Sequence, residues 1–204
     1  MFLRSCYTAV MEIAELVSRS RSYRRFNAAI QIEETTLKEL IALVRAAPSA
    51  ANRQPLKYML SCAPDSNRRI FETLAWAAYL RDWPGPTPDE RPAAYIVVLL
   101  DTGLAKEADV DVGIAAQTIL LGATARGLGG CMFGAVRREE LASRLRLPGH
   151  LTIALVIALG TPVEHVVMED LPANRSIEYY RTPDGTHHVP KRSVDELIHS
   201  ICAG

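Results

Sequence analysis

A cluster of arginines near the start of the chain has the composition of a site for an anion. Four arginines fall within the seven residues 19–25 of the stretch Arg19–Ser20–Arg21–Ser22–Tyr23–Arg24–Arg25–Phe26. Guanidinium groups bind phosphate oxygens in a bidentate manner, and serine hydroxyls add neutral donors. Because the net charge of the chain is zero, this local charge favours a small anionic ligand over a nucleic acid. A solvated basic turn after a helix is the alternative interpretation.

A second polar stretch, Ala47–Pro55, is bounded by prolines at positions 48 and 55. Ser49, Asn52 and Gln54 carry short hydrogen-bonding groups that can recognise the edge of a heterocycle. The two prolines restrict the backbone, as a preformed binding loop requires. A plain connection between a helix and a strand explains the same residues equally well.

Four glycines lie within the segment Gly127–Gly134. Glycine lets a backbone approach a ligand closely and present its N–H groups. A helix cap at Gly127 followed by a tightly packed strand is the more common explanation of such glycines. No Lys-Ser or Lys-Thr pair follows, so this is not a phosphate loop of the Walker type.

The remaining polar clusters give weaker signals. His187 and His188 are adjacent, so in a strand they would point to opposite faces, and we assign no metal site to them. Lys191 and Arg192 could add positive charge for a phosphate or simply solubilise the tail. The acidic residues of 107–111 are most simply the polar entry to a buried helix, and no serine–histidine–acid set indicates hydrolysis.

The elements that must position these stretches are predicted from hydrophobic periodicity and capping patterns. Expected helices cover Met11–Val17, Thr36–Ala46, Ser66–Leu80, Val110–Arg126, Glu139–Leu145 and Ser193–Ile201, with capping boxes at Thr36–Glu39 and Ser193–Glu196. Expected strands cover Lys57–Ala63, Ala94–Leu100, Leu151–Leu159 and part of Gly127–Gly134. Four prolines make residues 81–92 a surface loop. About four strands alternate irregularly with helices, which predicts an α+β fold with helices around one sheet.

Composition limits the class of protein. The 204 residues are 49% hydrophobic and 23% charged, which is typical of one globular domain spanning residues 1–204. The four scattered cysteines fit a reducing compartment, and the start of the chain lacks the pattern of a signal peptide. The longest apolar run, 151–159, is too short to span a bilayer, so we expect a cytoplasmic protein. Met11 opens a cleaner helix than Met1, and we hypothesise that residues 1–10 are a dispensable extension.

Taken in order, the polar stretches resemble the FMN-dependent nitroreductase family. Four stretches of the chain are similar to patterns of the family. Ser20–Phe26 is similar to RRSxRxF, and Ala47–Pro55 is similar to APSxxNxQP. Gly113–Leu121 is similar to GxAAQNLLL, and Gly127–Gly134 is similar to GLGxCxxG. The basic tail at Lys191–Arg192 also has a counterpart in the family. The resemblance spans about residues 12–197, which is nearly the whole chain.

The resemblance implies helices packed around a central, mostly antiparallel or mixed sheet, in an intertwined homodimer with FMN at the subunit interface. It implies a two-step reaction that passes a hydride from NAD(P)H to a nitroaromatic, a quinone or a similar acceptor. Because the flavin carries the chemistry, no catalytic side chain is assigned. The implied FMN contacts are Ser20, Arg21, Ser22, Arg24, Pro48, Ser49, Ala50, Asn52, Gln54, Met132, Phe133, Gly134, Lys191 and Arg192.

Three departures from the family pattern bear on these assignments. Ser20 stands where many members have arginine, and Arg19 is the candidate to replace that charge. Gly134 stands where some members have an acidic residue, and the loop 81–92 is short, which leaves the flavin face more open. The alternatives are a specialised flavin enzyme acting on another substrate, a flavin-binding redox protein with little turnover, and a phosphate-binding module without flavin.

Overall fold

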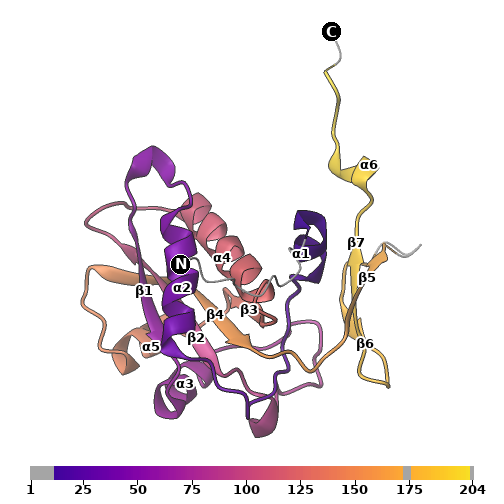
Figure 1. Ribbon diagram of the computed structural model, residues 1–204, viewed down its shortest axis with the longest axis horizontal. Helices are drawn as coiled ribbons and strands as arrows, with labels where there is room; N and C mark the ends of the chain where they lie inside the picture. The colour runs from indigo at the N-terminus through magenta and orange to yellow at the C-terminus, as the bar shows by residue number, and fades with distance from the viewer. Residues whose placement is uncertain (1–11, 172–175, 203–204) are drawn as a thin grey trace, which may run out of the picture.

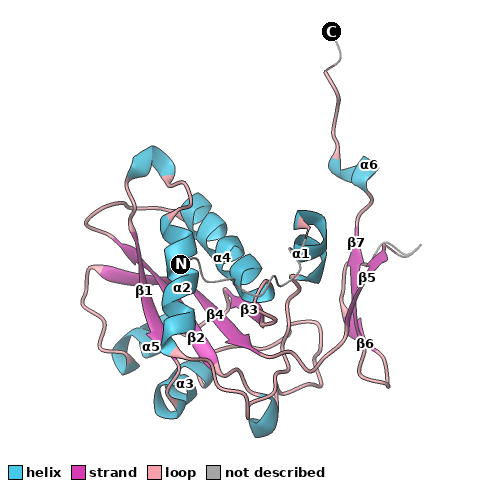
Figure 2. Cartoon of the chain, viewed as in Figure 1, coloured by secondary structure: helices cyan, strands magenta, loops and turns pink. Residues whose placement is uncertain are grey.

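The computed structural model describes residues 12–171 and 176–202, so the hypothesis about residues 1–10 lies outside the described part of the chain. The helices are α1 (Ile13–Arg19), α2 (Glu34–Arg45), α3 (Pro64–Phe71), α4 (Asp109–Thr124), α5 (Arg138–Arg144) and α6 (Val194–Leu197), with short 3₁₀ turns η1 (Ala50–Asn52) and η2 (Pro88–Glu90). The strands are β1 (Leu56–Ser61), β2 (Ala94–Asp101), β3 (Gly129–Phe133), β4 (Leu151–Gly160), β5 (Val166–Asp170), β6 (Tyr180–Arg181) and β7 (His187–Lys191). Figure 2 shows this distribution of helices and strands.

The main sheet has the strand order β1-β2-β4-β3, and every neighbouring pair is antiparallel. The two central strands, β2 and β4, are the continuous apolar runs of the sequence, because a central strand is covered on both faces. Helices α2 and α4 lie on one face and α3 and α5 on the other. The predicted α+β fold with a mostly antiparallel sheet is therefore confirmed.

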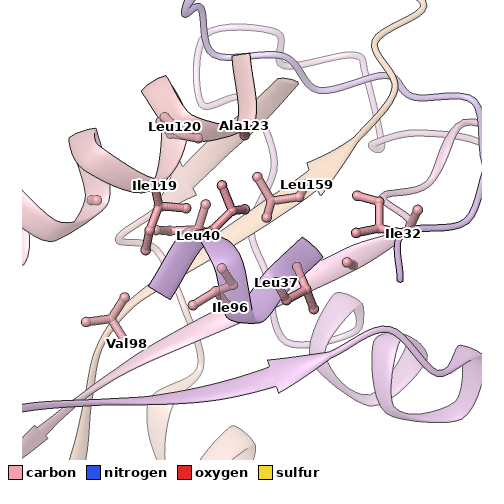
Figure 3. Close-up of a cluster of buried hydrophobic side chains, with 13 residues drawn as sticks. Ile32, Leu37, Leu40, Ile96, Val98, Ile119, Leu120, Ala123 and Leu159 are labelled. Atoms are coloured by element: carbon pink, nitrogen blue, oxygen red, sulfur yellow. The ribbon is translucent and has the colours of Figure 1, made fainter. Parts of the chain in front are cut away.

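Alternate residues of β2 divide the core into two layers. Ile96 and Val98 pack against α2 and α4, and Figure 3 shows them with Leu37 and Leu40 of α2 and with Ile119 of α4. Their neighbours Tyr95, Val97 and Leu99 face the opposite layer, which contains Ile70 of α3 and Leu141 of α5. This alternation follows from the period of two residues in a strand.

A second sheet of three strands lies beside the first and was not predicted. Its order is β5-β7-β6, with β5 parallel and β6 antiparallel to β7. These strands are short and partly exposed, so they lack the continuous apolar runs that identify β2 and β4. Beyond β7 the chain leads through α6 to the C-terminus, away from the main sheet (Figure 1).

Several predicted helix boundaries are wrong. Helix α3 begins at Pro64 instead of Ser66, and α4 ends at Thr124 instead of Arg126. Helix α2 begins at Glu34, so Thr36 lies inside it, and Glu33 at its N-cap makes no side-chain cap. Helix α3 ends at Phe71 instead of Leu80, because Leu74 pairs with Val136 in a β-bridge and the following backbone is bonded outside the helix. Helix α6 has the predicted capping box at Ser193 but ends at Leu197 instead of Ile201.

None of the helices within residues 12–171 and 176–202 combines the length and the apolar character that crossing a bilayer requires.

The close approach of Gly160 to Phe26 gives a first testable prediction. A Cβ atom at Gly160 would lie 2.7 Å from Cδ1 of Phe26, whose side chain is completely buried. Gly160→Ala is therefore expected to lower the free energy of unfolding by about 1–3 kcal/mol, because the core must shift to admit the methyl group. Urea denaturation would measure the change. Gly149→Ala is the matched control, since no atom lies within 4 Å of its Cβ position; equal losses in the two variants would contradict the prediction.

Candidate functional site

The arginine stretch is attached to the beginning of β3. Ser22 pairs with Gly130 in a parallel bridge, and the Tyr23 N–H donates to the Gly130 carbonyl oxygen over 3.0 Å. A Cβ at Gly129 would lie 2.5 Å from the Tyr23 ring, so this glycine serves packing against the arginine stretch. The contact brings residues 20–26 beside the strand that leads to Gly134, although more than a hundred residues separate them in sequence.

The four arginines of the stretch differ in their partners. Arg19 pairs with Glu15 over 3.4 Å, and the side chain of Arg25 pairs with Glu90. Among the described residues, neither Arg21 nor Arg24 forms an ion pair with a carboxylate. Two positive charges of the stretch are thus available to a ligand.

Glu164 holds the backbone of this stretch in place. Its side chain is completely buried and accepts hydrogen bonds from the N–H groups of Arg24 and Arg25, the latter over 3.2 Å. Its second oxygen pairs with the guanidinium of Arg181 over 3.0 Å. A carboxylate that is buried and satisfied in this way fixes the chain that surrounds it.

The guanidinium of Arg24 contacts neutral groups. Its Nη1 lies 3.2 Å from Nε2 of His187 and 3.3 Å from the carbonyl oxygen of Ser22. Its central carbon lies 4.6 Å from the centre of the Tyr179 ring, a cation–π distance. Burial and the neighbouring charges of Arg24 and Arg181 lower the pKa of His187 to about 4, so this histidine is neutral at neutral pH.

The polar loop between α2 and β1 is held by Asp111 of α4. The Ser49 hydroxyl donates to this carboxylate over 2.5 Å, and the Ala50 N–H donates to its other oxygen over 3.0 Å. Ser49 Oγ also accepts from the Gln54 N–H over 3.0 Å. Asp111 is itself buried, although its sequence position suggested only a polar entry to the helix.

The backbone of this loop has an unusual conformation. The φ angles of Ala51, Asn52 and Gln54 are 49°, 53° and 51°, which lie in the left-handed region that residues other than glycine rarely adopt. Such strain persists where the surrounding contacts over-determine it, and it is concentrated at binding sites. The hydrogen bonds from Ser49 and Ala50 to Asp111, and from the Gln54 N–H to Ser49, hold the loop in this conformation.

A pocket of about 280 Å³ opens beside the loop. Its walls come from α2, the polar loop, the start of β1 and the first turns of α4. Ser49, Asn52 and Gln54 line it together with Tyr58 and Asp111. Burial and the nearby Asp111 charge raise the pKa of Tyr58 to about 12, so its hydroxyl stays protonated and able to donate.

The comparison with known families decides the identity of the fold. A family model described as the nitroreductase family matches residues 17–161. The chain belongs to the nitroreductase family. This finding confirms the resemblance that the four sequence patterns indicated.

Similar nitroreductase-family proteins come from several organisms. The chain is 26% identical over 168 residues, covering 79% of this chain and 83% of the relative, to a protein of Methanothermobacter thermautotrophicus named "Putative NADH dehydrogenase/NAD(P)H nitroreductase". The structure of an FMN-dependent nitroreductase from Clostridium difficile R20291 is similar with a TM-score of 0.59 and 19% identity, covering 75% of this chain and 89% of that one. The NADPH:FMN oxidoreductase from Vibrio harveyi, in complex with NAD⁺, is similar with a TM-score of 0.61 and 23% identity, covering 79% and 74%. At these identities the two structures show a shared fold.

Within one nitroreductase-family chain, the predicted contact residues fall into separate groups. The arginine stretch lies beside β3, where Met132 is exposed, Phe133 is buried against Trp76 and Gly134 is exposed. The polar loop lies elsewhere, at the turn between α2 and β1 in the upper left of Figure 1, with α4 between it and the arginine stretch. A single chain therefore does not bring these two groups together.

The basic tail forms a third group. Lys191 ends β7, and Arg192 pairs with Glu196 over 3.6 Å. Lys191 shares a strand face with His187, because the two are four residues apart. Lys191 is exposed at the end of the strand that carries His187, the residue in contact with Arg24.

Four residues that organise the site were not predicted as site residues. They come from the second sheet and the segments that lead into it. The Arg24 side chain contacts Tyr179 and His187, and its backbone N–H donates to Glu164, which pairs with Arg181. Single residues of these types carry no local pattern. The one local signal among them is that His187 and His188 are adjacent, and this signal indicated no site, because adjacent residues of a strand point to opposite faces.

Proposed function

We propose that this chain is an FMN-dependent oxidoreductase that transfers a hydride from NAD(P)H to a small acceptor such as a nitroaromatic or a quinone. The observation that carries the proposal is the pair of arginines, Arg21 and Arg24, that have no carboxylate partner in the described part of the chain and lie beside the strand that leads to Gly134. The names of the relatives agree with this cofactor and this electron donor.

The residues present fit an FMN group. A phosphate carries almost two negative charges at neutral pH, and Arg21 with Lys191 could neutralise them, with Ser20 and Ser22 as neutral donors. Arg24 would stabilise the negative charge that a flavin gains on its pyrimidine side when it is reduced. When bound, FMN supplies the hydride chemistry, and the protein supplies position and charge. The exposed Gly134, with no atom within 4 Å of its Cβ position, leaves its backbone accessible to the reactive edge of the ring.

We propose a homodimer in which the polar loop of one subunit completes the site of the other. The loop residues Ser49, Ala50, Asn52 and Gln54 are preorganised, yet the same chain directs no arginine stretch at them. The C-terminal segment exposes large apolar side chains that a second copy would cover. They are Val194 at 69% exposure, Leu197 at 71%, Ile198 at 47% and Ile201 at 80%.

The visible absorption spectrum of the purified protein, with chromatography of the released cofactor, tests the cofactor. A yellow protein that releases FMN and oxidises NADH or NADPH when a quinone is added would support the proposal. A yellow protein without turnover would favour a flavin-binding protein. A colourless protein that takes up no added FMN would contradict the proposal.

Complementation between two inactive variants tests the shared site. Arg21→Ala and Asn52→Ala lie in different groups of one chain, so each homodimer should be defective at both sites. In a mixed dimer both substitutions fall on one site, and the other site carries neither. Mixed dimers are therefore expected to recover up to half of the wild-type activity per dimer. Steady-state NAD(P)H oxidation after co-expression would measure this. The absence of recovery, with mixed dimers shown by mass spectrometry, would place both groups in the site of one subunit.

A further inference from the structure

The contacts of His187 suggest a role that the cofactor chemistry alone does not require. His187 is 1% exposed and lies in β7, the middle strand of the second sheet. It pairs with Val166 of β5 on one side and with Arg181 of β6 on the other, and its N–H donates to the His165 carbonyl over 2.8 Å. Its backbone is therefore held from both sides.

The protonation of the His187 ring follows from its partner. Arginine can only donate, so Nε2 of His187 must accept the hydrogen bond from Nη1 of Arg24, 3.2 Å away. In the neutral ring the proton then resides on Nδ1. This Nδ1 is buried and has no hydrogen-bond partner among the described residues, so nothing else in the described structure selects the tautomer.

Burial and the charged groups around the ring favour the same state. Arg24, Arg181 and His188 all oppose a positive charge on His187, and the Tyr179 ring lies 5.2 Å from it between centres. The carboxylate of Glu164, which could attract a proton, is already engaged with Arg181 and two backbone N–H groups. A neutral acceptor leaves the full charge of Arg24 uncompensated, which a carboxylate in the same place would not do.

We propose that His187 is a positioning residue, which uses Nε2 of its Nδ1-protonated tautomer to direct the Arg24 guanidinium toward the cofactor without neutralising it. This inference rests on the proposed function, in which Arg24 faces the flavin. It assigns a purpose to the second sheet, whose middle strand carries this acceptor. His188, the next residue, points to the opposite face and pairs with Glu169 over 3.0 Å.

A first experiment needs no cofactor. Two-dimensional ¹⁵N NMR of the histidine rings in the flavin-free protein is expected to show His187 with Nδ1 protonated and Nε2 unprotonated at neutral pH. Arg24→Ala is expected to raise the pKa of His187 toward the ordinary value, since it removes a positive neighbour and the donor to Nε2. An Nε2-protonated ring, or a pKa unmoved by Arg24→Ala, would overturn the assignment.

A second experiment uses two amide variants. Glutamine can place an acceptor near the position of Nε2, whereas the shorter asparagine reaches only the position of Nδ1. His187→Asn is expected to weaken FMN binding by about tenfold and to make the flavin midpoint potential more negative, while His187→Gln stays near the wild type. His188→Asn is the control on the other strand face and should leave both quantities unchanged.

The outcomes separate this inference from the proposed function. A wild-type protein that binds no FMN would contradict the proposed function and, with it, this role of Arg24. A wild-type protein that binds FMN, with affinity and potential unchanged in His187→Asn, would overturn only the role of His187. Thermal unfolding of each variant shows whether it is folded, and if His187→Asn does not fold, the NMR experiment still decides.

Discussion

The double variant Arg21→Ala/Arg24→Ala is expected to purify without flavin and to bind added FMN roughly a thousandfold more weakly than the wild type. Both arginines lack carboxylate partners among the described residues, so their removal leaves no buried carboxylate unpaired. Each charge-assisted hydrogen bond contributes about 1.5–3 kcal/mol, and two of them together account for about three orders of magnitude. Titration of the flavin-free protein with FMN, followed by flavin fluorescence, measures the affinity.

Arg19→Ala is the matched control for this result. It removes one positive charge from the same stretch. The sequence offered Arg19 as a replacement for the arginine that many family members have at position 20, but in the structure Arg19 is paired with Glu15 and half exposed. We expect its FMN affinity to change by less than about fivefold, since an exposed pair contributes at most about 1 kcal/mol. The two single variants would show how the effect divides between Arg21 and Arg24. An affinity of the double variant equal to that of Arg19→Ala would remove both arginines from the site.

Glu164→Gln is expected to lower the free energy of unfolding by about 3–5 kcal/mol, because it leaves the guanidinium of Arg181 buried without its counter-charge. An amide also has one acceptor oxygen where the carboxylate has two. If that oxygen meets the N–H groups of Arg24 and Arg25, the amide NH₂ faces Arg181, and two donors oppose each other. Equilibrium denaturation in urea or guanidinium chloride would measure the loss.

Two further variants make the Glu164 prediction specific. Glu169→Gln changes a carboxylate of the second sheet that is partly exposed and bonded to His188, and we expect a change within about 1 kcal/mol. Glu164→Gln/Arg181→Gln removes both charges and should recover part of the stability lost in the single variant. A Glu164→Gln loss no larger than that of Glu169→Gln would show that the buried pair does not hold the arginine stretch.

Local signals in the sequence were sufficient for the main sheet and for the family. The apolar runs at 94–100 and 151–159 predicted the two central strands, because a strand buried on both faces needs an apolar residue at every position. The four polar and glycine-rich patterns predicted nitroreductase membership, which the family model confirms. The single domain, the homodimer and the individual FMN contacts stay predictions.

Non-local contacts decided what the sequence could not. Helix α3 is shorter than predicted because Leu74 pairs with the distant Val136 in an isolated β-bridge, and such pairings override local helical periodicity. The second sheet escaped prediction because its strands are short and half exposed.

The site shows the same division between local pattern and tertiary structure. The sequence by itself assigned the arginines, the polar loop and the glycine segment to the nitroreductase family, because each is a contiguous pattern that resembles one of the family's patterns. Only the tertiary structure decided how the side chains of Arg24 and Arg25 are used, since Glu90 folds against Arg25 while Arg24 meets His187. The pair of Arg19 with Glu15 is a local contact within one helix. The tertiary structure alone also placed Asp111 under the polar loop and His187 against Arg24. A single aspartate or histidine forms no local sequence pattern, and its partner here lies far away in the sequence.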